Sequence, residues 1–160
     1  MSTKALPLFT GSENKILRTK SKEVRVITKN IKKLLEKMHA TVREEGGVGL
    51  AAPQVGENLR IIIAQISGTF LEMINPEILS FSEKCESGEE GCLSLPGIWG
   101  IVRRSSEITV QFLDLKGRQR ILNLKGFNAR VVQHEVDHIN GVLFIDRAQN
   151  TSENRTGTAL

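Results

Sequence analysis

The stretch NARVVQHEVDHIN, residues 128–140, predicts a helix that lies in the interior of the protein. Apolar residues recur along it at helical spacing, and Gly141 follows as a C-terminal stop. Residues four apart on a helix project from nearly the same side, so His134 and His138 can reach one cation. Glu135, one step away, can reach a water bound to that cation. The stretch therefore predicts a metal site on an interior helix.

A His-Glu-x-x-His pattern can also arise by chance in a polar helix. The two histidines would then be surface residues flanked by solvated acids. The neighbouring apolar residues argue against this alternative because they draw the helix inward; they are Val131, Val132, Val136 and Ile139. Buried histidines beside a buried glutamate need polar partners. A metal ion would supply them.

A catalytic metal needs a third protein ligand and an open position. No histidine follows His138, and the only later glutamate, Glu153, lies in a polar tail. Upstream, the segment EGCLSLP (residues 90–96) holds a cysteine in apolar surroundings. Cys92 would by default be a small buried hydrophobe, but the missing third ligand makes it the best candidate thiolate. We interpret Cys85, in a more polar segment, as structural.

The segment GVGLAAPQVG (residues 47–56) combines glycines, alanines and a proline, so other backbone segments can approach it closely. A tight turn before the next strand is the alternative interpretation. A phosphate-binding loop is excluded because the Gly-Lys-Ser/Thr ending is absent. Gln54 is the one polar side chain in this segment. A buried amide needs a hydrogen-bond partner, and a substrate carbonyl is a natural one.

Helical and strand patterns divide the rest of the chain. Residues 31–42 have the apolar spacing of a helix, with Thr28 or Asn30 as its N-cap and Gly46-Gly47 after its end. Four segments have the composition or alternation of strands: residues 59–66, 70–74, 107–113 and 120–125. The last two form a hairpin, and Asn75-Pro76 is expected to end the second as a turn. The order helix, strands, helix predicts an α+β domain.

Composition narrows the class of protein. A chain of 160 residues fits one domain, residues 1–160, with a polar tail over residues 151–160. The net charge is +4, but the Lys32-Lys33 and Arg103-Arg104 doublets are interpreted as solvated faces. With 4% aromatic residues and no tyrosine, a base-stacking surface for single-stranded nucleic acid is not expected.

Two cysteines and no signal peptide favour a cytosolic protein, although a mature organellar protein would have the same features. The longest apolar run, residues 61–64, is far too short to span a membrane. We therefore expect no membrane partner.

Three segments together resemble the signature segments of the peptide deformylase family: GVGLAAPQ (residues 47–54), EGCLS (residues 90–94) and HEVDH (residues 134–138). They occur in that order and span more than half of the chain. The resemblance implies an α+β fold in which antiparallel or mixed β-sheets wrap around a central metal-binding helix. It also implies a metal-dependent hydrolase that removes the N-formyl group from the N-terminal formylmethionine of newly synthesised polypeptides and releases formate.

The resemblance also assigns roles to individual residues. The metal ligands would be Cys92, His134 and His138. Glu135 would be the general acid/base, and Gln54 with the backbone N–H of Leu93 would hold the developing oxyanion. Gly49 would bind the substrate backbone. The methionine pocket would be walled by Val48, Glu90, Phe127, Val131 and His134. The cofactor would be one divalent metal ion, Fe(II) in vivo, with Zn, Ni or Co able to occupy the site.

The expected partners are formylated N-termini of nascent polypeptides, with a transient contact to the ribosome and no specific nucleic acid. The expected location is the bacterial cytosol or an organelle. Two other functions stay open. A zincin-like metallopeptidase would cleave ordinary peptide bonds, but the absent downstream ligand argues against it. A catalytically silent, metal-stabilised binding domain would not need Glu135 and Gln54.

Overall fold

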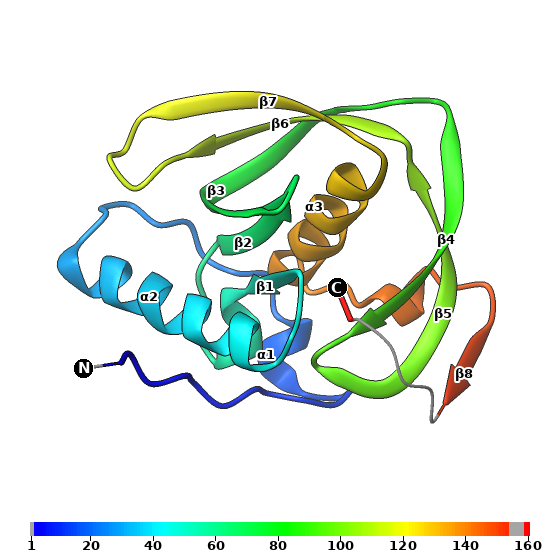
Figure 1. The fold of residues 1–160 in the computed structure, drawn as a ribbon, viewed down its shortest axis with the longest axis horizontal. Coiled ribbons are helices and arrows are strands. Elements are labelled where there is room, and N and C mark those ends of the chain that lie inside the picture. Colours follow the sequence, from blue (N-terminus) through cyan, green and yellow to red (C-terminus); the bar gives the residue numbers. More distant parts are fainter. Residues whose placement is uncertain (1, 154–158) are drawn as a thin grey trace.

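The computed structural model describes residues 2–153 and 159–160, and its elements form an α+β fold, as predicted (Figure 1). The helices are α1 (Lys15–Arg18), α2 (Lys29–Glu44) and α3 (Gly126–Ile139), with 3-10 turns η1 (Ala52–Val55) and η2 (Phe144–Asp146). The strands are β1 (Gly49–Ala51), β2 (Ile61–Ile66), β3 (Thr69–Phe81), β4 (Cys85–Cys92), β5 (Leu95–Ser105), β6 (Glu107–Leu113), β7 (Gln119–Lys125) and β8 (Thr151–Glu153).

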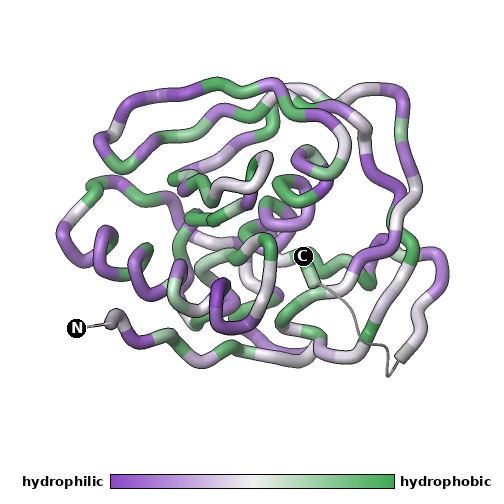
Figure 2. The backbone as a smooth tube through the Cα atoms, viewed as in Figure 1, coloured by the Kyte–Doolittle hydropathy of each residue, from purple (hydrophilic) through white to green (hydrophobic). Residues whose placement is uncertain are grey.

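The strands form two antiparallel sheets around α3. One sheet has the order β1-β2-β3-β6-β7 and the other the order β4-β5-β8. Figure 1 shows α3 between them, with α2 on the far side of the first sheet's β1 end. Hydrophobic residues gather in the central strands, whereas the outer turns of α2 are hydrophilic (Figure 2). The predicted arrangement of sheets around a central helix is confirmed.

Helix α3 is buried over most of its length, which is why it can carry an interior site. Its apolar residues belong to one core cluster with residues of β2, β3 and β6: Ala129, Val131, Val132, Val136 and Ile139. Gly141 follows the helix with φ +77°, a conformation that glycine adopts without steric cost. None of the described helices is long and apolar enough to cross a membrane.

Helix α2 confirms the predicted helix of residues 31–42. Thr28 caps its N-terminus, since its side chain accepts a hydrogen bond from the N–H of Ile31 at 3.3 Å. The helix stops at Glu44, and the N–H of Gly47 then donates to the carbonyl of Val42 at 3.0 Å. This ending turns the chain into β1, which carries Gly49 of the candidate site.

The prediction of a turn at Asn75-Pro76 is wrong, because β3 continues through these two residues. Asn75 has φ +51°, and the register between β3 and β6 shifts just after Ile74. Asn75 and Pro76 therefore form a bulge inside one long strand. The Asn75 side chain stabilises the bulge: it accepts from the N–H of Val24 and donates to the carbonyl of Val24, both at 2.8 Å. A local turn signal could not reveal these distant partners.

The hairpin of β6 and β7 is confirmed, and β2 begins at Ile61, two residues later than predicted. The sequence patterns did not predict β1, β4, β5, β8 or the short α1. Strand β4 has the sequence CESGEEGC, which lacks the β-branched residues that indicate strands. Its pairing with β5 over eight residues holds it instead.

Candidate functional site

The structure brings Cys92, His134 and His138 together. Cys92 is the last residue of β4, and both histidines lie on one side of α3. One ligand atom from each residue lies within 4.8 Å of the others, and the Cys92 Sγ is 3.2 Å from Nε2 of His138. All three side chains are buried. One thiolate and two imidazoles at this spacing suit a single transition-metal cation.

Unsatisfied polar atoms surround this triad. Among the described residues, Nε2 of His134, Nδ1 of His138 and both carboxylate oxygens of Glu135 are buried without a hydrogen-bond partner. Such atoms are rare in folded proteins because each costs free energy when it is left unpaired. A cation held by Nε2 of His134 would satisfy that atom, and a water beside the cation would satisfy the Glu135 carboxylate; Nδ1 of His138, the ring nitrogen not beside Cys92, is outside this account. The residues present therefore fit a divalent metal ion.

The electrostatics of the protein alone oppose charge at this position. Burial raises the pKa of the Cys92 thiol, and the Glu135 carboxylate raises it further. Burial also raises the pKa of Glu135, with the charge of Glu90 adding to it. Burial lowers the pKa of His138, and the neighbouring His134 lowers it further. A bound cation reverses this balance because it stabilises a thiolate and neutral imidazoles.

Gln54 lies beside the triad, fully buried in η1. Its Oε1 accepts from the N–H of Ala51 at 2.9 Å, so the amide cannot flip freely. Its Nε2 donates to Oγ of Ser94 at 3.1 Å and lies 3.7 Å from the Cys92 Sγ. An amide donor therefore faces the edge of the metal site. Ser94 was missed as a site residue, although it belongs to the EGCLS segment.

Of the other residues expected to bind substrate, some lie beside the candidate metal site or in the core, and one lies on the surface. Gly49 lies in β1 directly against the carboxylate of Glu135. Val131 is fully buried in the α3 core cluster, and Val48 packs against the same cluster. Phe127 is 55% exposed and lines a surface pocket that also includes Arg130 and none of the three candidate metal ligands. No described contact supports a role for Phe127 in the methionine pocket, so its role stays a prediction.

The Leu93 side chain packs against the start of the glycine segment. A Cβ on Gly47 would lie 2.8 Å from its Cδ1, so the two segments meet without room for a larger residue. This contact joins EGCLS to GVGLAAPQ, two of the three segments on which the resemblance depends. Leu93, the residue after Cys92, is thereby held against the glycine segment.

Glu90, expected as a wall of the pocket, also orients one of the candidate metal ligands. It is fully buried, and its Oε1 lies 2.9 Å from Nδ1 of His134. Arg104 donates two hydrogen bonds to it, at 2.9 and 2.8 Å, and Arg130 donates a third at 2.6 Å. Burial would raise the pKa of Glu90, but the Arg104 and His134 hydrogen bonds outweigh burial and hold it well below its usual range. The anion fixes the His134 ring so that Nε2 faces the site.

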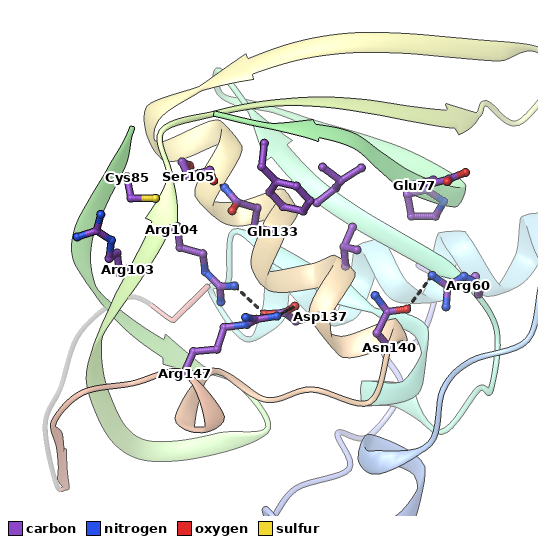
Figure 3. A pocket seen from close by; sticks show the side chains of 14 residues that line it. Arg60, Glu77, Cys85, Arg103, Arg104, Ser105, Gln133, Asp137, Asn140 and Arg147 are labelled. Carbon is purple, nitrogen blue, oxygen red and sulfur yellow. Dashed lines mark hydrogen bonds and ion pairs between the residues drawn. The ribbon is translucent and has the colours of Figure 1, made fainter. Parts of the chain in front are cut away.

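The same network extends along α3 to Asp137 (Figure 3). Arg104 donates to Oδ2 of Asp137 at 2.6 Å, and Arg147 donates to both Asp137 oxygens at 2.8 and 2.9 Å. The interpretation of Arg103-Arg104 as a solvated doublet is wrong for Arg104, which is 5% exposed. Successive residues of β5 point to opposite faces, so Arg103 is exposed while Arg104 turns inward.

A cavity of about 560 Å³ lies on another face of α3 (Figure 3). Helix residues Gln133, Val136, Asp137 and Asn140 line it. Helical spacing turns these residues away from the direction that His134 and His138 share. The cavity is therefore separate from the candidate metal site, and none of the three candidate ligands lines it.

Comparisons with known proteins agree with this geometry. A sequence model of the polypeptide deformylase family matches residues 7–154. The peptide deformylase of Desulforudis audaxviator is 46% identical over 134 residues, which is 83% of this chain and 87% of the relative. That of Dictyoglomus thermophilum is 48% identical over 133 residues, or 83% and 86% of the two chains.

Solved structures give the same result. The crystal structure of peptide deformylase from Thermotoga maritima is similar with a TM-score of 0.88 and 40% identity, covering 91% of this chain and 99% of that one. A class I type b peptide deformylase from Acinetobacter baumannii with bound Met-Ala-Ser is similar with a TM-score of 0.85 and 40% identity, covering 89% and 99%.

Proposed function

Because the chain belongs to the polypeptide deformylase family, we infer that it is a metal-dependent hydrolase that removes the N-formyl group from newly made polypeptides. The observation that carries this function is the convergence of Cys92, His134 and His138 beside the unpaired carboxylate of Glu135. The products are formate and a polypeptide with a free N-terminal amine.

We propose that Cys92, His134 and His138 hold the metal ion. Such an ion would lower the pKa of a water bound to it to roughly 7 and would polarise a carbonyl oxygen. The ligand set suits ferrous iron or zinc. We propose Fe(II) as the native metal on the basis of the family resemblance, with Zn, Ni or Co able to replace it.

Glu135 would move the proton in the reaction. Its carboxylate has no partner among the described residues, so both oxygens are available to take a proton and return it. It would accept a proton from the water whose oxygen adds to the formyl carbon. It would then deliver that proton to the amine nitrogen as the carbon–nitrogen bond breaks. Without this delivery the amine is a very poor leaving group.

Gln54 and Leu93 would stabilise the charge that develops on the formyl oxygen. The Gln54 Nε2 lies beside Cys92, and the backbone N–H of Leu93 belongs to the next residue along the chain. Removing one such donor typically costs about 3–4 kcal/mol in the barrier. Gly49 would pair with the substrate backbone, and Val48, Glu90, Val131 and Phe127 remain the proposed surroundings of the methionine side chain.

We further propose that the substrate is met at the ribosome, in the cytosol of a bacterium. The net charge of +4 would favour a transient contact with a surface rich in phosphate. The curated relatives named above are bacterial proteins.

A paired assay tests the function. The metal-loaded protein is given formyl-Met-Ala and, separately, Met-Ala, and formate and free amino acids are measured. Deformylation of the first without peptide cleavage of the second is expected. Cleavage of Met-Ala alone would instead indicate the metallopeptidase.

A variant separates catalysis from binding. Glu135→Ala should retain its metal and its structure and lose roughly 10²- to 10⁴-fold in kcat. Unchanged turnover in this variant would overturn the assignment of Glu135. A complete absence of turnover in the unchanged protein, with metal bound, would indicate the silent binding domain.

A further inference from the structure

The last residue of the sequence, Leu160, lies inside the molecule rather than on its surface. Its side chain is 3% exposed and belongs to the core cluster that contains Val131 and borders on Val48. Its backbone N–H donates to the carbonyl of Gly91 at 3.1 Å. Figure 1 shows this end of the chain close to β1, α3 and the end of β4. A tail of polar composition thus ends on a buried leucine.

Gly91, which accepts this hydrogen bond, shows that Leu160 lies beside the candidate metal site. Gly91 is the residue between Glu90, which orients His134, and the metal ligand Cys92. It lies in β4, an edge strand of its sheet among the described residues, and pairs with Trp99 of β5 on its inner side. A segment that adds to such an edge gains backbone hydrogen bonds and places its side chains in the adjoining pockets.

We propose that Leu160 is an internal ligand of the substrate site, occupying the pocket for the substrate's methionine side chain and competing with it. The inference rests on the proposed function for the identity of that substrate. Leucine and methionine are close in volume and exchange in apolar pockets at small cost. Val48 and Val131, two of the proposed pocket residues, belong to or border the cluster that buries Leu160.

The length of the tail is compatible with this placement. β8 pairs with β5 at the other edge of the three-stranded sheet, through residues 151–153. From there to the free edge of β4 is about three strand spacings, or about 14 Å. The seven residues after position 153 could reach at most about 25 Å when extended. β8 therefore anchors the tail within reach of the site, which keeps Leu160 at a high local concentration.

Amide NMR of the zinc-loaded protein tests the placement directly. The Leu160 amide should be dispersed and protected from hydrogen exchange, and saturating Met-Ala-Ser should release it to the signal of an unfolded tail. Met-Ala-Ser is the peptide bound in the Acinetobacter baumannii structure. A Leu160 signal that is already that of an unfolded tail before peptide is added would overturn the proposal.

Kinetics test the competition. Leu160→Ser should lower KM for formyl-Met-Ala-Ser by roughly 3- to 10-fold with kcat unchanged, because it removes a tethered competitor. Leu160→Met, which keeps an apolar side chain of similar volume, should keep the original KM. Equal KM values in all three proteins would contradict the inference. If none of them deformylates the peptide, the proposed function fails, whereas the NMR titration still decides whether Leu160 occupies the site.

Discussion

Gly49 and Glu135 meet across β1 and α3 with no space for a side chain between them. A Cβ on Gly49 would lie 2.7 Å from Oε1 of Glu135 and 2.9 Å from its Cγ, closer than real Cβ atoms approach other groups. The Gly49 backbone does not need a positive φ, so glycine is required here for room and not for its conformational freedom. The strand and the carboxylate are packed as one unit.

Gly49→Ala should therefore displace the Glu135 carboxylate. We expect kcat for a formylated peptide to fall roughly 10- to 100-fold, because general acid–base catalysis depends on the position of the group. Metal content should stay unchanged, since no metal ligand is touched. Steady-state kinetics together with elemental analysis measure both quantities.

Gly68→Ala is the control for this substitution. Gly68 lies in the turn between β2 and β3 with φ +85° and has no atom near its added Cβ. Alanine there should cost about 1 kcal/mol of stability through backbone strain alone. Its kcat should remain that of the unchanged protein. An equal loss of kcat in both variants would show that destabilisation, and not the Glu135 contact, causes the effect.

The two cysteines offer a matched test of the metal site. Cys92→Ala removes the sulfur that lies 3.2 Å from Nε2 of His138, so metal per chain should fall well below one after dialysis. Cys85→Ala should retain the original content, because Cys85 is outside the group of candidate ligands. Elemental analysis measures the metal content per chain in both variants. Full occupancy in Cys92→Ala would exclude this thiol as a required ligand.

The sequence could predict the parts of the site that depend on local spacing. His134, Glu135 and His138 follow from the geometry of one helix, and Cys92 from the donor chemistry that a metal requires. The sequence also predicted that other backbone segments can approach the glycine segment closely. It did not predict which residue does so, because no nearby residue indicates that Gly49 packs on Glu135. That contact depends on how β1 crosses α3.

Long-range partners explain what the sequence did not predict. Arg104 looks like half of a solvated doublet until the structure places Glu90 and Asp137 around it. Asn75 looks like the start of a turn until Val24 binds both ends of its amide. Leu160 ends a polar tail, and only the carbonyl of Gly91 indicates where it lies. In each case the deciding residue is distant in sequence.

The buried charge network predicts a difference between two arginines. Arg104→Ala leaves the Glu90 carboxylate, which is fully buried, short of two hydrogen bonds, and should cost about 3–5 kcal/mol of unfolding free energy. Arg147→Ala removes a side chain that is 49% exposed and should cost less than about 1 kcal/mol. Urea unfolding of the two variants measures this. Similar losses would mean that burial does not set the strength of these ion pairs.

The contact between α2 and β3 should make the stability of the protein depend on pH. His39 Nε2 lies 2.7 Å from Oε1 of Glu72, and this hydrogen bond lowers the pKa of Glu72 against the opposing effect of burial. A carboxyl whose pKa is lowered on folding stabilises the protein above its unfolded pKa of about 4.3, and the stabilisation is lost as the pH falls through the folded value.

Glu72→Gln should therefore be less stable than the unchanged protein by about 1 kcal/mol at pH 6, a value reduced by the partial exposure of the pair. The difference should begin to shrink as the pH falls below about 4 and should be gone once the pH is below the lowered folded-state pKa of Glu72, where the carboxyl is protonated in both states. Glu36→Gln, on the exposed side of α2, is the control and should show no such pH dependence. Urea unfolding at a series of pH values measures the difference. A gap between Glu72→Gln and the unchanged protein that stays constant down to pH 3 would show that the carboxylate charge contributes nothing to the contact.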